Sequence, residues 1–210
     1  MKRYIKSEEE FTAGGENFDG YMGSIGWQGK NASLNLDIKE VAKIIRTQFK
    51  KKYPEYKISA RISRFSGGED INIVVTVPKS LLMPEQEFVD MCVQNPYGYI
   101  RGYRWIGCYD DNGKWVQYQA EEIGKMSTEE RQDFFTRYYE HTVDRYTNDE
   151  YDKISYRGEE DAEWPIPLKD DSALQYVYSL MKSFNYRDSN SMVDYYSTNF
   201  YGFVYYKYGA

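Results

Sequence analysis

The stretch that decides the fold spans residues 37–77 and reads DIKEVAKIIRTQFKKKYPEYKISARISRFSGGEDINIVVTV. Its first part carries the signals of a helix. Asp37 and Glu40 have the spacing of a capping box, in which each side chain bonds a backbone N–H at the helix start. Apolar residues then recur every three or four positions as far as Phe49. This pattern predicts an amphipathic helix, which ends at Pro54 because proline cannot continue it.

The second part of the stretch has the two-residue period of strands. Apolar and polar residues alternate from Tyr56 to Ser63 and again from Ile71 to Val77, as expected where one face of a sheet is buried. Ser66-Gly67-Gly68 lies between the two runs, and glycine there favours a tight turn. A β-hairpin is therefore predicted directly after the helix.

Periodic patterns continue through the rest of the chain. The last strand carries aromatic residues on both faces, which is typical of a strand that is central in a sheet or otherwise covered. The predicted elements are a helix over 85–94, an aromatic hairpin over 97–119 turning at Asn112-Gly113, a helix from Ser127 to about Tyr146 that opens with a capping box to Glu130, an acidic loop over 147–171, a helix from Asp171 or Ser172, and a strand over 199–208.

This order of elements predicts an α+β fold with a small, mostly antiparallel sheet and packed helices. The order is helix, hairpin, insert, helix and strand. Residues 1–36 are rich in glycine and are expected to form a loop-rich lead-in that can include a short strand. We expect residues 37–210 to form a single α+β domain, with residues 79–171 as an acidic, aromatic insert.

Composition and charge narrow the class of protein. The chain has 210 residues, no run of about 18 apolar residues, no apolar stretch after its first basic residues, and two cysteines. We therefore expect a soluble protein of a reducing cytoplasm, with no membrane contact and no disulfide framework. The formal net charge is −6, but residues 38–64 hold nine Lys/Arg against two Asp/Glu, whereas residues 119–171 hold sixteen Asp/Glu against seven Lys/Arg. Two such regions can meet different partners.

Two stretches together resemble a known family. Residues 40–75, EVAKIIRTQFKKKYPEYKISARISRFSGGEDINIVV, and residues 177–206, VYSLMKSFNYRDSNSMVDYYSTNFYGFVYY, resemble the opening and the ending of the large polyvalent protein-associated domain numbered twenty-nine. The resemblance implies an origin in a phage or conjugative element and a role in protecting or processing incoming DNA. The family has no agreed activity, so it assigns no catalytic residue. The wide separation of the two stretches departs from the family pattern.

Basic side chains on the predicted helix and hairpin are candidates for contact with DNA or RNA phosphates, which would make binding dependent on salt. The alternative is an ordinary solvated face, because an amphipathic helix always has a polar side. The candidate nucleic-acid-binding residues are Lys39, Lys43, Arg46, Lys50, Arg61 and Arg64.

Acidic and aromatic residues in two later segments are candidates for binding a partner protein. The insert can imitate nucleic acid and occupy the basic groove of a nuclease, or it can be a solvated loop. The turn after the last helix can bind a partner, or its polar side chains can merely order the backbone. The candidate partner-binding residues are Glu159, Glu160, Asp161 and Trp164 in the insert, and Asp188, Asp194 and Tyr195 in the turn.

The sequence shows no catalytic constellation. His141 is the only histidine, and neither Cys92 nor Cys108 lies in a nucleophile or zinc motif. No cofactor or metal is predicted. Our first hypothesis is a non-enzymatic interaction protein of a phage or mobile element that counters host defence by binding a CRISPR or restriction nuclease. The alternative is a nucleic-acid-binding module that uses the basic helix and hairpin, and an enzyme ranks third.

Overall fold

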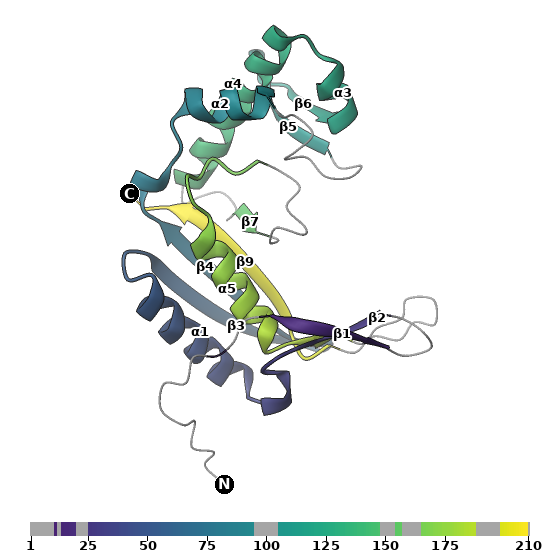
Figure 1. Cartoon of the computed structure of the whole chain (residues 1–210), viewed down its shortest axis with the longest axis vertical. Coiled ribbons are helices and arrows are strands. Elements are labelled where there is room, and N and C mark those ends of the chain that lie inside the picture. Colours follow the sequence, from purple (N-terminus) through teal and green to yellow (C-terminus); the bar gives the residue numbers. More distant parts are fainter. Residues whose placement is uncertain are drawn as a thin grey trace. The chain divides into compact units, whose positions relative to one another are not determined.

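The computed structural model (Figure 1) describes residues 11, 14–19, 25–94, 105–147, 154–156, 165–187 and 198–209. The helices and strands confirm the predicted α+β class. The chain divides into two compact units. Unit 1 comprises Met1–Ile73 and Gln175–Val204, and unit 2 comprises Val74–Leu174 and Tyr205–Ala210.

Helix α1 (Ile38–Lys52) begins and ends where its sequence predicts. The Lys39 amide donates to Asp37 Oδ1 at 2.8 Å, and the Asp37 amide donates to Glu40 Oε2 at 3.2 Å, which confirms the capping box. One face is buried, with Ile45 and Phe49 wholly inaccessible to solvent. Burying such side chains contributes roughly 1.5–3 kcal/mol each, so the apolar stripe fixes how α1 is rotated about its axis.

The predicted hairpin is confirmed as β3 (Lys57–Phe65) and β4 (Gly68–Val77), joined at Ser66 and Gly67. Gly68 has φ +143°, a conformation that side chains with a Cβ rarely adopt. The strands belong to a four-stranded sheet in the order β3-β4-β9-β7, where β9 is Tyr201–Tyr208 and β7 is Ile154–Tyr156. β9 thus has a neighbour on each side, which confirms the central position expected from its aromatic faces.

β9 runs in the same direction as β4. Its first residue, Tyr201, lies against Gly68, and the amide of Gly209, just after β9, donates to the Val77 carbonyl at 3.0 Å. Parallel strands need a long connection with a helix, and here the connection includes helix α5 (Ser172–Ser183). The pairs β1–β2, β2–β8 and β5–β6 are antiparallel.

Helices α1 and α5 cover the same face of β3, β4 and β9 (Figure 1). The part of this sheet that belongs to unit 1 is called the unit 1 sheet. The rings of Tyr53, just after α1, and Tyr176 on α5 are 5.7 Å apart, and the Lys52 ammonium lies 4.1 Å from the centre of the Tyr176 ring. On β9, a Cβ at Gly202 would lie 2.7 Å from Met181 of α5. The even-numbered residues of this end of β9 therefore face the helices.

The N-terminal segment holds more structure than its glycine content indicated. β1 (Gly15–Asp19) and β2 (Ile25–Gly29) pair antiparallel, and β2 also pairs with β8 (Tyr186–Arg187). The expectation allowed for one short strand in this segment, and the structure has two. The pairing partner β8 comes more than 150 residues later, so a local sequence pattern cannot reveal it.

The strand β2 is attached to the end of α5 by several polar contacts. The Gly29 amide donates to the Asn185 carbonyl at 2.8 Å, and the Asn31 amide donates to the Ser183 carbonyl at 2.7 Å. The buried side chains of Asn31 and Ser183 also bond each other at 2.7 Å. A Cβ at Gly29 would collide with the Ser183 carbonyl, so this close approach requires glycine.

Asn185 joins the end of α5 to the start of β9. Its Nδ2 donates to the Phe200 carbonyl at 2.8 Å, while its Oδ1 accepts from the amides of Tyr186 at 2.9 Å and Phe200 at 3.3 Å. Asn199 adds a bond from its Nδ2 to the Phe184 carbonyl at 3.1 Å. Two short motifs of the stretch 177–206, Ser-Phe-Asn-Tyr at residues 183–186 and Asn-Phe-Tyr at residues 199–201, therefore have a structural explanation within the described residues.

Unit 2 contains α2 (Glu85–Gln94), the hairpin β5 (Trp105–Tyr109) and β6 (Trp115–Gln119), α3 (Ala120–Lys125) and α4 (Thr128–Thr147). The prediction of two helices flanking an aromatic hairpin is confirmed for the described residues. The second capping box is present too, because Ser127 and Glu130 exchange side-chain to backbone bonds of 2.7 and 3.2 Å. The short α3 was not expected. The strand β7 was not expected either, because it lies in the segment predicted to be an acidic loop.

The insert builds an apolar core of its own. Tyr139 Oη donates to the Met83 carbonyl at 2.7 Å, so even the polar end of this buried ring is satisfied. The expected limits of the insert, residues 79–171, stay a prediction. The buried residues of this core are Met83, Phe88, Val89, Cys92, Ile106, Cys108, Ala120, Ile123, Phe134, Phe135, Tyr138 and Tyr139.

Candidate nucleic-acid interface

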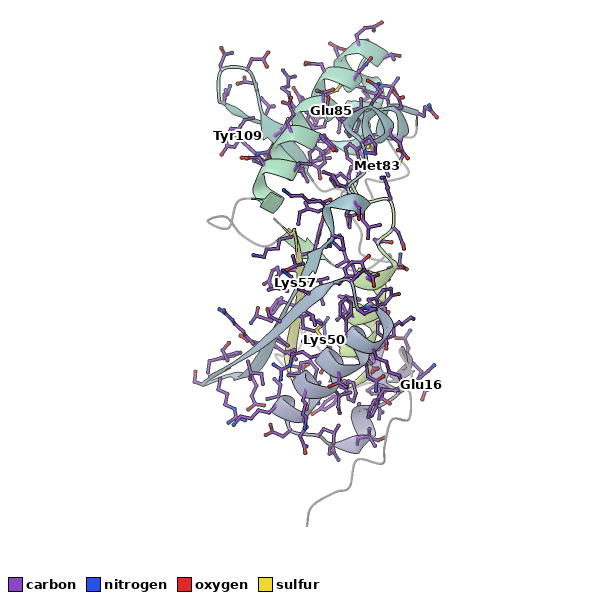
Figure 2. All side chains as sticks on the ribbon, turned by 90° about the vertical axis from the view of Figure 1, so that its left-hand side faces the viewer. Glu16, Lys50, Lys57, Met83, Glu85 and Tyr109 are labelled. Carbon is purple, nitrogen blue, oxygen red and sulfur yellow. The ribbon has the colours of Figure 1, made fainter. Side chains whose placement is uncertain are left out.

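Three lysines form a row on the exposed face of α1. Lys39, Lys43 and Lys50 are all exposed, and their spacing of four and seven residues places them on one side of the helix. Among the residues that the structure describes, none of the three forms an ion pair. Their charges are therefore available to a ligand. Figure 2 shows Lys50 on α1 and Lys57 at the start of β3.

Arg46 belongs to the same row but also has a structural contact. Its Nη1 donates to the carbonyl of Ala60 on β3 at 3.3 Å. This bond holds the guanidinium against the sheet while the side chain stays exposed. Arg46 can add to the positive potential of α1, but replacing it would also disturb the packing of α1 on β3.

The two hairpin arginines do not join this row. Arg64 pairs with Asp37 at 3.5 Å and with Glu69, so carboxylates already offset its charge. Arg61 is three residues away on the same strand, and successive side chains of a strand point to opposite faces. Arg61 therefore faces away from α1. The structure brings together Lys39, Lys43, Arg46 and Lys50, places Arg64 beside the start of α1 with its charge offset, and places Arg61 on the opposite face of the sheet.

The predicted partner-binding residues cannot be placed. Glu159, Glu160, Asp161, Trp164, Asp188, Asp194 and Tyr195 all lie outside the described residues.

The two cysteines lie in the core of unit 2. Burial raises the pKa of the Cys92 thiol to about 12. Burial also raises the pKa of Cys108 to about 11, although the nearby Arg137 guanidinium acts in the opposite direction. Both thiols are therefore protonated near neutral pH. Because the thiolate is the reactive form, neither side chain is suited to nucleophilic chemistry here.

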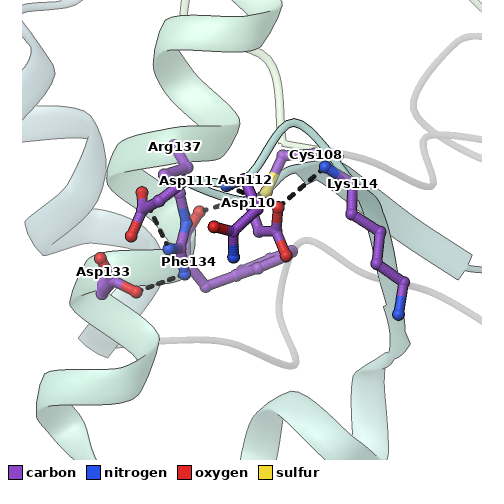
Figure 3. Close-up of polar contacts among 8 residues, drawn as sticks. All are labelled: Cys108, Asp110, Asp111, Asn112, Lys114, Asp133, Phe134 and Arg137. Carbon is purple, nitrogen blue, oxygen red and sulfur yellow. Dashed lines mark hydrogen bonds and ion pairs between the residues drawn. The ribbon is translucent and has the colours of Figure 1, made fainter.

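Figure 3 shows the polar contacts around Cys108. Arg137 on α4 pairs with Asp111 of the β5–β6 turn at 3.4 Å and with Asp133 one helical turn earlier. Within the turn, Asp110 Oδ1 accepts from the amides of Asn112 at 3.0 Å and Lys114 at 2.8 Å. These bonds orient the turn and hold it to α4, so the cluster has a structural role.

Exposed aromatic residues on the β5–β6 hairpin were not singled out from the sequence. Trp105, Tyr109 and Trp115 are exposed, and alternation places them on the hairpin face opposite the buried Ile106 and Cys108. The Tyr109 and Trp115 rings are 5.2 Å apart. Both lie on the expected acidic insert. The available signal was WIGCY, in which the aromatic Trp105 and Tyr109 occupy odd positions and the apolar Ile106 and Cys108 occupy even ones.

The described residues show neither a metal site nor a membrane-spanning helix. No group of three or more His, Cys, Asp or Glu side chains in this part of the chain is arranged to hold a metal ion. Within the same residues, no helix combines the length and the apolar character that crossing a membrane requires.

Comparison of the chain with protein-family models, with curated proteins and with solved structures gives no match. The resemblance of residues 40–75 and 177–206 to the polyvalent protein-associated domain therefore stays a prediction.

Proposed function

We propose that the protein is a non-catalytic nucleic-acid-binding module of a phage or conjugative element, acting in the cytoplasm of a bacterial host. The observation that carries the proposal is the row of exposed lysines on α1, Lys39, Lys43 and Lys50, which form no ion pair with described residues. The cellular setting follows from the family resemblance. The charge count supports the choice of ligand, since residues 38–64 are basic although the whole chain is acidic.

The geometry of the row suits a phosphate backbone. Lys39 and Lys50 are eleven residues apart, which corresponds to about 16 Å along the helix axis at about 1.5 Å per residue. Flexible lysine side chains over that length can reach several phosphates, and each contact releases condensed counterions. Three such contacts would contribute about 2–3 to the slope of log K against log salt concentration.

The test removes the three charges without touching Arg46. The variant Lys39→Gln/Lys43→Gln/Lys50→Gln is compared with wild type by fluorescence anisotropy on labelled single-stranded and duplex DNA, between about 50 and 200 mM salt. Glutamine keeps the helix propensity while it removes the charge. We expect weaker binding and a salt slope that is smaller in magnitude by about 2–3.

A matched control makes the result specific. Lys79, Lys114 and Lys125 are exposed lysines of unit 2, and their replacement by glutamine changes the net charge by the same amount. Equal binding by wild type and the α1 variant, or an equal loss in both variants, would show that α1 is not the contact surface.

A second candidate function is counter-defence, in which the protein binds and inhibits a host CRISPR or restriction nuclease. The observation that favours it is the exposed set Trp105, Tyr109 and Trp115 on the insert. Tryptophan and tyrosine are enriched among residues that dominate the energy of protein interfaces. The acidic balance of residues 119–171 would complement the basic groove of a nuclease.

Capture of host proteins and an inhibition assay test this second function together. Wild type should retain a nuclease and inhibit it, Trp105→Ala should lose both properties, and Asn112→Ala in the turn of the same hairpin should keep both. Asn112 is a suitable control because it is exposed and lies outside the two strands that carry the aromatic residues. Retention of the nuclease by Trp105→Ala at wild-type strength would exclude the aromatic face as the docking surface.

A further inference from the structure

The unit 1 sheet has a second face, which points away from α1 and α5. On β3, Arg64 contacts Asp37 at the start of α1, so the alternate residues Arg61, Ser63 and Phe65 point to the other side. The bond between the Ser63 and Asp70 side chains agrees with this assignment. On β9, Gly202 faces α5, so its neighbours on either side face away from the helices.

Three aromatic side chains lie exposed on this outer face. Phe65 is 49% exposed, Tyr201 43% and Phe203 42%. The Phe65 and Tyr201 rings lie 5.8 Å apart with an interplanar angle of 35°, and Phe203 follows Tyr201 on the same face two residues later. Aromatic residues of this size are normally buried, as Phe49 is on the helix-covered side. The outer face therefore presents a short row of rings to solvent.

Cationic and polar side chains continue this face along β3, beyond the rings. Arg61, Ser59 and Lys57 are exposed residues of β3 on the same face, four, six and eight residues from Phe65. Asp70 on this face accepts hydrogen bonds from Ser63 and, at 2.7 Å, from Asn72. The lysine and arginine form no ion pair with described residues, so this part of the face carries positive charge toward a ligand.

We propose that this outer sheet face binds single-stranded nucleic acid, with unpaired bases stacked on Phe65, Tyr201 and Phe203 and phosphates held by Arg61 and Lys57. Exposed rings on a sheet next to cations are suited to bases that are free to stack. The bases of a duplex are stacked inside it and cannot reach such rings. The complementarity between positive charge and phosphate favours nucleic acid over an apolar protein surface as the occupant.

This site goes beyond the proposed contact through α1. The lysine row and the aromatic row lie on opposite sides of the unit 1 sheet, because α1 covers one face and Arg61, Phe65 and Tyr201 lie on the other. One short oligonucleotide cannot lie on both surfaces. Variants of one surface therefore leave the other intact, and the two proposals can fail separately.

The test uses the full chain and two fluorescein-labelled probes, a thymidine oligonucleotide of about 15 nucleotides and a duplex of the same length. We expect Tyr201→Ala and Phe203→Ala to weaken binding of the single strand about tenfold or more and to leave duplex binding unchanged. Tyr201→Phe, which keeps the ring, should bind the single strand like wild type. Circular dichroism of each variant checks that the fold is retained.

Several results would overturn the proposal. One is single-strand binding by both alanine variants at wild-type strength, and another is equal loss for the single strand and the duplex. If Tyr201→Ala lowers the unfolding temperature, Arg61→Gln serves as a second variant, because Arg61 forms no contact that the fold requires among the described residues. Unchanged single-strand binding by Arg61→Gln and Phe203→Ala would then decide against the site. Loss of duplex binding in the α1 variant would still support the proposed function.

Discussion

Replacement of Asn185 by alanine tests whether the Ser-Phe-Asn-Tyr motif holds the fold together. The Asn185 side chain connects the end of α5 with the residues that lead into β9. It donates to the Phe200 carbonyl at 2.8 Å and accepts from the Phe200 amide at 3.3 Å and the Tyr186 amide at 2.9 Å. Alanine keeps the backbone bond from Gly29 to the Asn185 carbonyl, so the change isolates the side chain.

The expected loss follows from these three bonds. A hydrogen bond contributes about 0.5–1.5 kcal/mol net, and more when a partly buried partner is left unsatisfied. The Phe200 amide would lose its bond to Asn185, whereas the Phe200 carbonyl would keep a bond from Thr198 Oγ1 at 3.3 Å. We therefore expect Asn185→Ala to lower the free energy of unfolding by about 2–4 kcal/mol. Domains of this kind have a total stability of about 5–15 kcal/mol, so the variant folds but is clearly weakened.

Urea denaturation followed by circular dichroism measures this loss. With a denaturant slope of about 2 kcal/mol per molar, the unfolding midpoint should fall by about 1–2 M. Asn199→Ala removes a single bond to the Phe184 carbonyl and should cost about 0.5–1.5 kcal/mol. Asn112 is exposed in a turn, and Asn112→Ala should change stability by less than about 0.5 kcal/mol. An Asn185→Ala midpoint equal to that of Asn112→Ala would refute the structural reading of the motif.

Three further outcomes are expected. Gly29→Ala should destabilise the protein by about 1–3 kcal/mol in urea denaturation, because its Cβ would meet the backbone of α5; Gly67→Ala, where the nearest atom is 3.4 Å away, should cost much less. Asp37→Ala should lose about 1 kcal/mol with the cap of α1, measured by the same method. In the unfolded chain the cysteine thiols have a pKa of 9.0, whereas in the folded protein burial raises the pKa to about 12 for Cys92 and about 11 for Cys108. Above pH 9 the unfolded chain therefore loses protons that the folded protein keeps, so the free energy of unfolding should fall as pH rises. Cys92→Ala/Cys108→Ala should show a shallower fall.

Much of the fold was predictable because its signals are local. The capping boxes at Asp37 and Ser127 and the turn before Gly68 each lie within a few residues of the element that they begin or end. A helix start requires only that nearby side chains satisfy nearby amides. A two-residue alternation likewise predicts a strand wherever one face is buried.

The predicted nucleic-acid-binding residues lie together in the structure only where they share one helix. Lys39, Lys43 and Lys50 share a helix, so helical geometry alone places them together. Arg61 and Arg64 were grouped with them because all are basic, yet strand alternation sends one to each face of the sheet. The aromatic row was missed because Phe65 and Tyr201 are far apart in the sequence and meet only when β3, β4 and β9 form one sheet.

The sequence by itself determined the identity of the main helices and hairpins and the segregation of charge. These depend on periodicity and composition, which are properties of neighbouring residues. Tertiary structure alone decided that β1 and β2 pair with β8, that Asn185 joins α5 to β9, and that three aromatic rings remain on an open sheet face while others are buried. These features depend on contacts between distant residues. Such contacts form only when burial of the core outweighs the entropy lost in bringing those segments together.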